Sequence, residues 1–181
     1  MKVLLVYAHP ERTSVTRHLA ETASEVLKTQ GHEVMESDLY GMGCKAVFDD
    51  ADFPVRANQD RLSFIEESGH AFSNGYQTPD VEEEQRKLLA ADLVILVFPL
   101  WWFSMPAIMK GWVDRVWAFG LAYGYQGAGN TYRYGEGGFA GKRALLVVSV
   151  GSPEEDYSSR GINGSLEQLL FPITHGTFLF S

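Results

Sequence analysis

The chain has 181 residues, of which 45% are hydrophobic, and its formal net charge at pH 7 is −8. This length supports one domain with a sizeable core, while the negative charge and the lack of a basic stripe argue against nucleic-acid binding. No run approaches the ~20 apolar residues that a membrane-spanning helix needs, and we expect no signal peptide before the first strand. The single cysteine, Cys44, excludes an internal disulfide, and we expect a cytoplasmic protein.

Strand and helix patterns alternate from the N-terminus, with no repeat or linker between them. The continuous apolar run 2–8 predicts a buried strand of a parallel sheet. Residues 13–31 predict a helix that Thr13 or Ser14 caps and Gly31 ends. We expect one apolar helix face to turn toward the core, formed by Val15, Leu19, Ala23, Val26 and Leu27.

The next part of the chain is less regular. Residues 32–40 predict a shorter second strand. Segment 41–78 is polar and rich in turn residues, with one helix expected near 59–67, and a long irregular segment of this kind is usually functional or disordered. The run 78–91 then predicts a helix with Asp80 as its cap.

Regular alternation returns in the second half. The apolar run 92–98 predicts a third strand, and 105–120 predicts a helix with Pro106 in its first turn. A glycine- and tyrosine-rich excursion follows. It leads to a fourth strand over 142–150 and a last helix within 163–176.

The alternation of these elements predicts the fold class. It is typical of a doubly wound α/β sheet, here one domain spanning residues 1–181. After Thr177 only four residues remain, which is too little for a fifth strand.

Ligands of an open parallel sheet bind beyond the carboxyl ends of its strands. The loop after the first strand opens a helix, whose exposed N–H groups and dipole attract anions. It carries His9, Arg12, Thr13, Ser14 and Thr16. Helix capping explains one hydroxyl but not this whole set, so we predict a phosphate site. No G-x-G-x-x-G follows the strand, which disfavours an NAD-type Rossmann site.

The loop after the third strand presents Trp101, Trp102 and Phe103. One turn cannot easily bury three consecutive large rings, so we predict that they form a wall for a flat ligand. Trp112 and Trp117 have helical spacing and are expected in the core or in a dimer interface.

The loop after the fourth strand combines Gly151 with Tyr157 and Asn163. Gly151 permits close backbone approach to a ligand, whereas Tyr157 taken alone is as compatible with packing as with chemistry. The histidines lie far apart in the sequence and there is no cysteine cluster, so we predict no metal site.

Five segments carry a family resemblance: YAHPERTSVT, SDLY, TPDVEEEQRKLLAADLVILVFPLWWFSMPAIMKGW, AYGY and YSSRGINGS. Together they resemble the flavodoxin-like NAD(P)H:quinone oxidoreductases of the DT-diaphorase type. The resemblance covers about residues 2–177, and the block from Thr78 to Trp112 is its most specific part. It implies a flavodoxin-like sheet with strand order 2-1-3-4(-5), the fifth strand being missing or truncated here.

The resemblance also implies cofactors and site residues. It implies noncovalent FAD, with FMN as the alternative, at a homodimer interface, and NAD(P)H as co-substrate. It places flavin contacts at His9, Thr13, Thr16, Pro99, Leu100, Trp102, Phe103, Ser149 and Gly151. The loops described above add Ser14 and Trp101. Tyr123 and Tyr125 match tyrosines that line the substrate pocket across the dimer, and Tyr157 matches the tyrosine that assists hydride transfer.

The chain departs from the family pattern in three places. The animal enzymes carry a histidine partnering that tyrosine, where this chain has Asn163, and a glutamine where it has Trp101. Asn163 cannot become cationic, so charge stabilisation would rest on Tyr157 and backbone donors. The family also continues into another strand, so we expect a weaker sheet edge and weaker cofactor retention here.

The function implied is flavin-dependent two-electron reduction of quinone-like acceptors by NAD(P)H through ping-pong hydride transfer. Bacterial members include drug-modulator quinone reductases and ancillary subunits of potassium efflux systems. One alternative is therefore a flavin-binding regulatory subunit of a membrane efflux partner, itself not inserted in the membrane. Another is a one-electron carrier, against which the tyrosine-rich excursion 123–134 argues.

Overall fold

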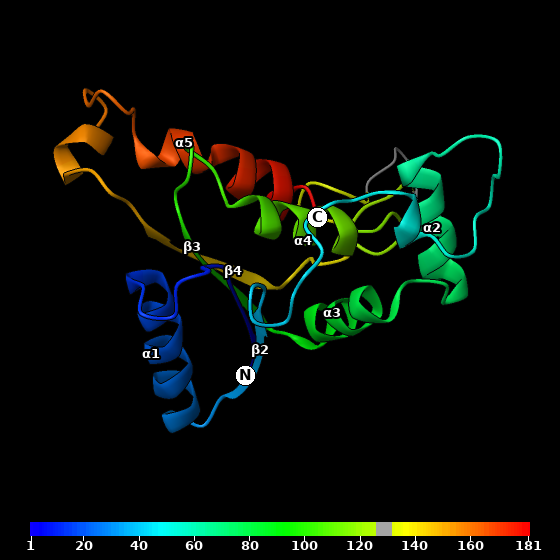
Figure 1. Ribbon diagram of the computed structural model, residues 1–181, viewed down its shortest axis with the longest axis horizontal. Coiled ribbons are helices and arrows are strands. Elements are labelled where there is room, and N and C mark those ends of the chain that lie inside the picture. Colours follow the sequence, from blue (N-terminus) through cyan, green and yellow to red (C-terminus); the bar gives the residue numbers. More distant parts are fainter. Residues whose placement is uncertain (126–131) are drawn as a thin grey trace.

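The computed structural model describes residues 1–125 and 132–181, and its centre is a four-stranded parallel sheet of order β2-β1-β3-β4 (Figure 1). The strands are β1 (Lys2–Tyr7), β2 (Glu33–Asp38), β3 (Leu93–Pro99) and β4 (Arg143–Ser149). The predicted α/β class and the strand order 2-1-3-4 are confirmed. Part of the predicted excursion, 126–131, lies outside the described residues.

The helices follow the predicted alternation. They are α1 (Val15–Thr29), α2 (Phe64–Asn74), α3 (Pro79–Ala90), α4 (Ala107–Val116) and α5 (Leu166–Ile173), with short helical turns at Asp50–Asp52, Glu154–Tyr157 and Thr174–Leu179. The helix expected near 59–67 lies further along the chain, because Gly75 ends it in the left-handed conformation with a φ of 68°. Asp80 does not cap α3: Thr78 holds the cap position.

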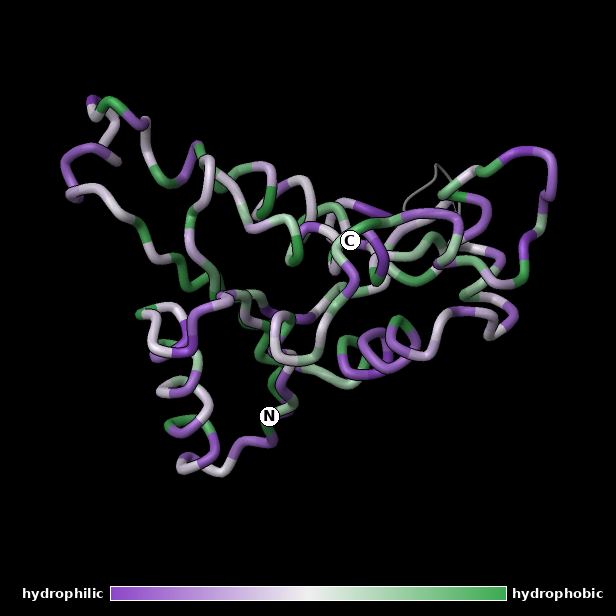
Figure 2. Tube along the Cα trace, in the orientation of Figure 1, coloured by the Kyte–Doolittle hydropathy of each residue, from purple (hydrophilic) through white to green (hydrophobic). Residues whose placement is uncertain are grey.

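Different helices cover the two faces of the sheet. Leu4 and Val6 of β1 point to the face that packs against α3, α4 and α5, and the alternate residues Val3 and Leu5 point to the face that α1 covers. Figure 2 shows the hydrophobic positions gathered along these central strands. As predicted, Trp112 is fully buried, and Trp117 is packed against the same core.

The side of α1 that faces the sheet matches the predicted apolar face only in part: Leu27 packs against the core as predicted. The buried residues are Thr16, Ala20 and Ser24, with 2%, 0% and 5% of their surface exposed. The prediction was wrong for Val15, Leu19 and Val26, which are 67%, 37% and 48% exposed. Small side chains let the helix backbone approach the sheet closely, so contact distance outweighed hydrophobicity in setting the face.

This assignment predicts opposite outcomes for neighbouring residues of α1. Ala20→Leu should lower the free energy of unfolding by about 1–3 kcal/mol, because the larger side chain must enter a closely packed contact. Leu19→Ala, the matched control, should change it by less than about 1 kcal/mol. Urea unfolding of both variants measures the two changes. A larger loss of stability in Leu19→Ala than in Ala20→Leu would indicate that the apolar face predicted from the sequence packs against the sheet.

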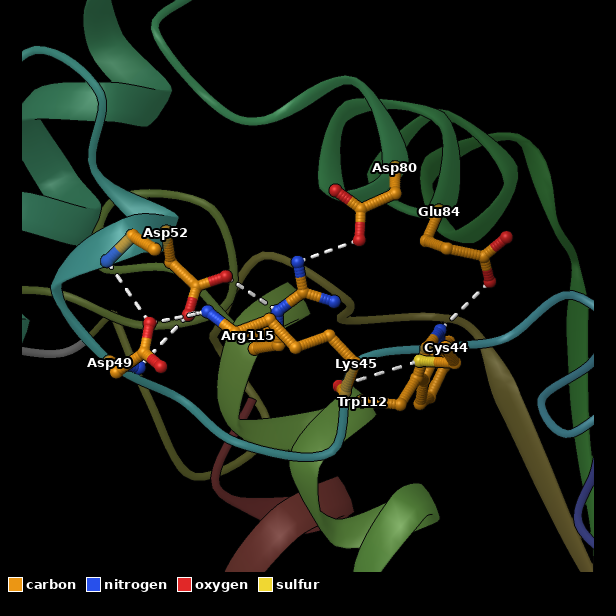
Figure 3. A network of polar contacts seen from close by, with 9 residues as sticks. Cys44, Lys45, Asp49, Asp52, Asp80, Glu84, Trp112 and Arg115 are labelled. Atoms are coloured by element: carbon orange, nitrogen blue, oxygen red, sulfur yellow. Dashed lines mark hydrogen bonds and ion pairs between the residues drawn. The ribbon is translucent and has the colours of Figure 1, made fainter.

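The irregular segment after β2 lies across α4 (Figure 3). Arg115 of α4 donates from Nε to Asp52 Oδ1 at 2.6 Å and from Nη2 to Asp80 Oδ2 at 2.6 Å. A Cβ at Gly111 would lie 2.0 Å from the carbonyl oxygen of Ala46, so glycine is required for this close approach. The segment is thus held by an ion pair and by close backbone packing.

A second buried carboxylate holds the end of that segment. Glu67 of α2 has no exposed surface and accepts the amide N–H groups of Ala57 at 2.8 Å and Asn58 at 3.1 Å, with Arg56 Nε at 3.4 Å. Burial alone would raise the pKa of Glu67, but these hydrogen bonds outweigh it and hold the pKa below its ordinary value of 4.5. The charged form is therefore the one that the fold stabilises.

The direction of this pKa shift predicts a pH dependence. Since the folded pKa lies below the unfolded one, Glu67 stabilises the fold above pH 4.5 and loses its effect as the pH falls through the folded pKa. Glu67→Gln should cost about 1–3 kcal/mol at pH 7 and less at pH 3. Urea titrations at both pH values measure the difference, and a cost that stays constant between them would contradict the account.

Candidate active site

A cavity of about 410 Å³ lies at the carboxyl ends of β1, β3 and β4. It is lined by His9, Ser14, Val15, Thr16, Pro99, Leu100, Trp101, Ser149, Val150 and Gly151. Most of the predicted cofactor residues are therefore brought together. Thr13, Trp102 and Phe103 are adjacent in sequence to lining residues but do not line the cavity themselves.

The N-terminus of α1 forms one side of this cavity. Ser14 is the cap, and its hydroxyl oxygen accepts the N–H of Arg17 at 3.2 Å. Within the described residues, no protein acceptor meets the N–H groups of Val15 and Thr16. Two such donors at the positive end of a helix suit an anionic group.

A hydroxyl pair joins the first and last loops of the cavity. Thr16 Oγ1 lies 2.8 Å from Ser149 Oγ, and Thr16 is almost fully buried. This contact fixes the start of α1 against the end of β4. The separation of the two loops is therefore set by the protein.

Thr13 is held by contacts within its own loop. Its amide N–H and its hydroxyl both donate to Glu11 Oε1, each at 3.0 Å. The Thr13 hydroxyl is therefore engaged by the protein instead of lining the cavity. These bonds from Thr13, first the backbone and then the side chain, lower the pKa of Glu11.

His9 is also oriented by this turn. The backbone N–H of Glu11 donates to His9 Nδ1 at 3.0 Å, and the carbonyl oxygen of Glu11 lies 3.3 Å from the same nitrogen. The His9 ring lies 5.6 Å from the Trp101 ring between centroids, tilted by 60°. The first loop and the tryptophan loop thus meet at this pair of rings.

The tryptophan loop is a strained turn. Trp101 and Ser104 form an antiparallel bridge, and the residues between them, Trp102 and Phe103, have φ values of 51° and 61°. Two consecutive positive φ angles define a type I′ turn, which normally carries Asn-Gly. Trp102 is 94% exposed, so packing in this chain does not explain the strain. Strain of this kind concentrates at functional sites.

The loop after β4 places only part of its predicted set at the cavity. Gly151 lines it, whereas Tyr157 and Asn163 do not. The backbone N–H of Asn163 donates to the backbone carbonyl oxygen of Asp156 at 3.0 Å, and a Cβ at Gly161 would lie 2.2 Å from that same oxygen. The loop is therefore closed on itself, which keeps Tyr157 and Asn163 in one compact turn.

The predicted substrate tyrosines lie elsewhere in the chain. Tyr123 lines a second cavity of about 330 Å³, between α2, α4 and the C-terminal segment, and no residue lines both cavities. Tyr123 and Tyr125 lie against Phe119, with ring centroids 5.7 Å and 5.8 Å from it. Burial, and secondarily the neighbouring Tyr125, raises the pKa of Tyr123.

Some features of the site were missed from the sequence. The lining contributions of Val15 and Val150, and the role of Glu11 in orienting Thr13 and His9, were not predicted. A signal for Glu11 exists, because a carboxylate two residues before a threonine can close a turn onto its N–H.

Within the described residues, no group of three or more potential ligands could hold a metal ion, and no helix could cross a membrane.

Comparisons with known proteins define the family. A family model described as "Flavodoxin-like fold" matches residues 1–181. A ribosyldihydronicotinamide dehydrogenase-like protein of Penicillium crustosum is 48% identical over 183 residues, which cover 99% of this chain and 68% of that protein. The NAD(P)H dehydrogenase [quinone] 1 of Rattus norvegicus is 40% identical over 180 residues, which cover 99% of this chain and 64% of that protein.

Solved structures agree with these relatives. A candidate quinone reductase from Klebsiella pneumoniae matches with a TM-score of 0.95 and 50% identity, over 99% of this chain and 71% of that one. The chain thus spans 64% to 71% of the length of these similar proteins. It belongs to the flavodoxin-like NAD(P)H:quinone oxidoreductase family.

Proposed function

We propose that this chain is an NAD(P)H-dependent quinone reductase that works with a bound flavin, FAD in the first instance. The observation that carries the proposal is the 410 Å³ cavity, which joins the N-terminus of α1 to the strained tryptophan turn. The names of the relatives support the activity, and they do not favour a purely regulatory flavin-binding subunit. The single cysteine fits a reducing compartment, so the proposal includes a cytoplasmic location.

The residues present suit a flavin. The cavity volume lies within the ~300–1,000 Å³ typical of cofactor sites. The Val15 and Thr16 amides and the Ser14 loop would hold the phosphate, and the turn carrying Trp101, Trp102 and Phe103 would lie against the ring system. When bound, the flavin would supply hydride transfer from NAD(P)H to the acceptor in two successive half-reactions.

The protein's own contribution is positioning and local charge. The Thr16–Ser149 contact fixes the distance between the phosphate loop and the end of β4. Gly151, with no side chain, would let the backbone approach the ring, and Pro99 and Leu100 at the end of β3 would line the same cavity. Tyr157 is the proposed hydrogen-bond donor at the charge-bearing edge of the cofactor. Asn163 would orient it without carrying charge.

We propose a homodimer with the active site at its interface. Tyr123 and Tyr125 share no cavity with the flavin loops of their own chain, so they reach a flavin only if a second copy supplies them. Tyr125 is well exposed, as a residue that contacts a second copy requires. A flat quinone would then lie between the flavin and these tyrosines.

Reconstitution tests the proposal. The purified chain is mixed with FAD or FMN, freed of unbound flavin, and reduced anaerobically with NADH or NADPH. We expect retained flavin to lose its visible absorbance on reduction and to recover it when a quinone is added, without a stable semiquinone. A chain that retains neither flavin would defeat the proposal, and a stable blue semiquinone would favour the one-electron carrier.

A further inference from the structure

Glu11 places a fixed negative charge beside the proposed phosphate site. Its carboxylate accepts hydrogen bonds from the backbone N–H and the hydroxyl of Thr13, both at 3.0 Å. Its own backbone N–H donates to His9 Nδ1 at 3.0 Å. The side chain is thus fixed near the start of α1, although it is exposed to solvent. No ion pair within the described residues involves Glu11.

The carboxylate occupies both donors of Thr13, the residue just before the helix cap. Thr13 directs both of its donors to Glu11, while the next amide groups, those of Val15 and Thr16, have no protein acceptor within the described part of the chain. Thr13 and Val15 are two residues apart, so their backbone nitrogens lie at most about 7 Å from each other. A phosphate bound at the Val15 and Thr16 amides would therefore lie in the neighbourhood of the carboxylate that Thr13 holds. Two negative charges at such a distance repel each other, and salt screens the repulsion.

We propose that Glu11 is a specificity-determining residue whose charge weakens the binding of phosphate-bearing flavins relative to riboflavin, which has no phosphate. The inference rests on the proposed function, since it assumes that the flavin phosphate binds at the start of α1. Glu11 then has two opposing effects. Its hydrogen bonds shape the loop that orients His9, and its charge limits how tightly that loop retains an anionic cofactor.

Neutralising the charge separates the two effects. Glu11→Gln keeps an oxygen that can accept from Thr13 but removes the negative charge. We expect the affinity for FMN to rise about threefold to tenfold at low ionic strength, with riboflavin affinity unchanged, and the gain to shrink toward zero in ~1 M salt. Quenching of flavin fluorescence on binding measures both dissociation constants without any turnover.

The control is Glu25→Gln, which removes the same charge from an exposed position further along α1 and should leave both affinities unchanged. Thermal unfolding and riboflavin binding verify that each variant is folded, and Glu11→Ser provides a second neutral variant. Inorganic phosphate should compete with FMN more strongly in Glu11→Gln than in the parent chain.

The possible failures are distinguishable. FMN affinity that is unchanged or reduced in folded Glu11→Gln, while the parent chain binds FMN and riboflavin, would overturn this inference alone. An equal gain for FMN and riboflavin would also overturn it, because the effect would not involve phosphate. If the parent chain binds neither flavin, the proposed function fails and this inference fails with it.

Discussion

Replacing Arg115 with methionine is expected to lower the free energy of unfolding by about 3–5 kcal/mol. The guanidinium is almost fully buried, and Asp52, which it contacts at 2.6 Å, is buried as well. Methionine fills part of the volume but leaves the Asp52 carboxylate, among residues 1–125 and 132–181, with Lys45 at 2.9 Å as its one remaining cationic partner. The cost comes from this poorly compensated buried charge.

A double-mutant cycle measures that cost. Chemical unfolding is followed for Arg115→Met, Asp52→Asn and the pair together. The double variant should be more stable than Arg115→Met alone, since asparagine leaves no buried charge. Additive losses would show that the ion pair is not the cause. Phe48 belongs to the irregular segment that carries Asp52, and it lines the 330 Å³ cavity. Loss of the Arg115–Asp52 ion pair should therefore also alter the surroundings of Tyr123, which lines the same cavity.

Substituting Asn-Gly for Trp102-Phe103 is expected to make the chain more stable and less able to bind flavin. Non-glycine residues in the left-handed region cost roughly 1–2 kcal/mol each, and Asn-Gly is the pair that type I′ turns prefer. We therefore expect the free energy of unfolding to rise by about 1–2 kcal/mol. Losing two stacked rings should weaken flavin binding at least about tenfold.

The matched control is Ala-Ala at the same two positions. Alanine removes the same rings but retains the Cβ atoms that cause the strain, so it should lose flavin affinity without gaining stability. Urea unfolding and flavin fluorescence titration are run on both variants. Full flavin affinity in the Asn-Gly variant would remove the turn from the proposed site, and unchanged stability would show that the turn is not strained.

The fold could be predicted from the sequence because its signals are local and strong. The apolar runs of β1 and β3 are continuous, as both faces of a parallel sheet are buried, and glycine and proline mark the ends of several helices. The face of α1 was predicted only in part, for the opposite reason. Its orientation depends on how closely Ala20 must approach the sheet, and no local pattern encodes that distance.

The candidate site was predictable as a set of loops but not in detail. The rule that ligands bind beyond strand ends placed His9, Thr16 and Trp101 at one edge, and they line one cavity. Their roles in binding remain predictions. The orientation of Thr13 toward Glu11 and the strain at Trp102 depend on side-chain and backbone geometry that residue types do not specify.

The central claim is that the cavity at the ends of β1, β3 and β4 holds a flavin. A crystal structure of the chain grown with FAD or FMN tests it most directly. We expect phosphate oxygens within about 3 Å of the Val15 and Thr16 amide nitrogens and the ring system against Trp102. Flavin bound at any other surface, with this cavity filled by water, would contradict the account.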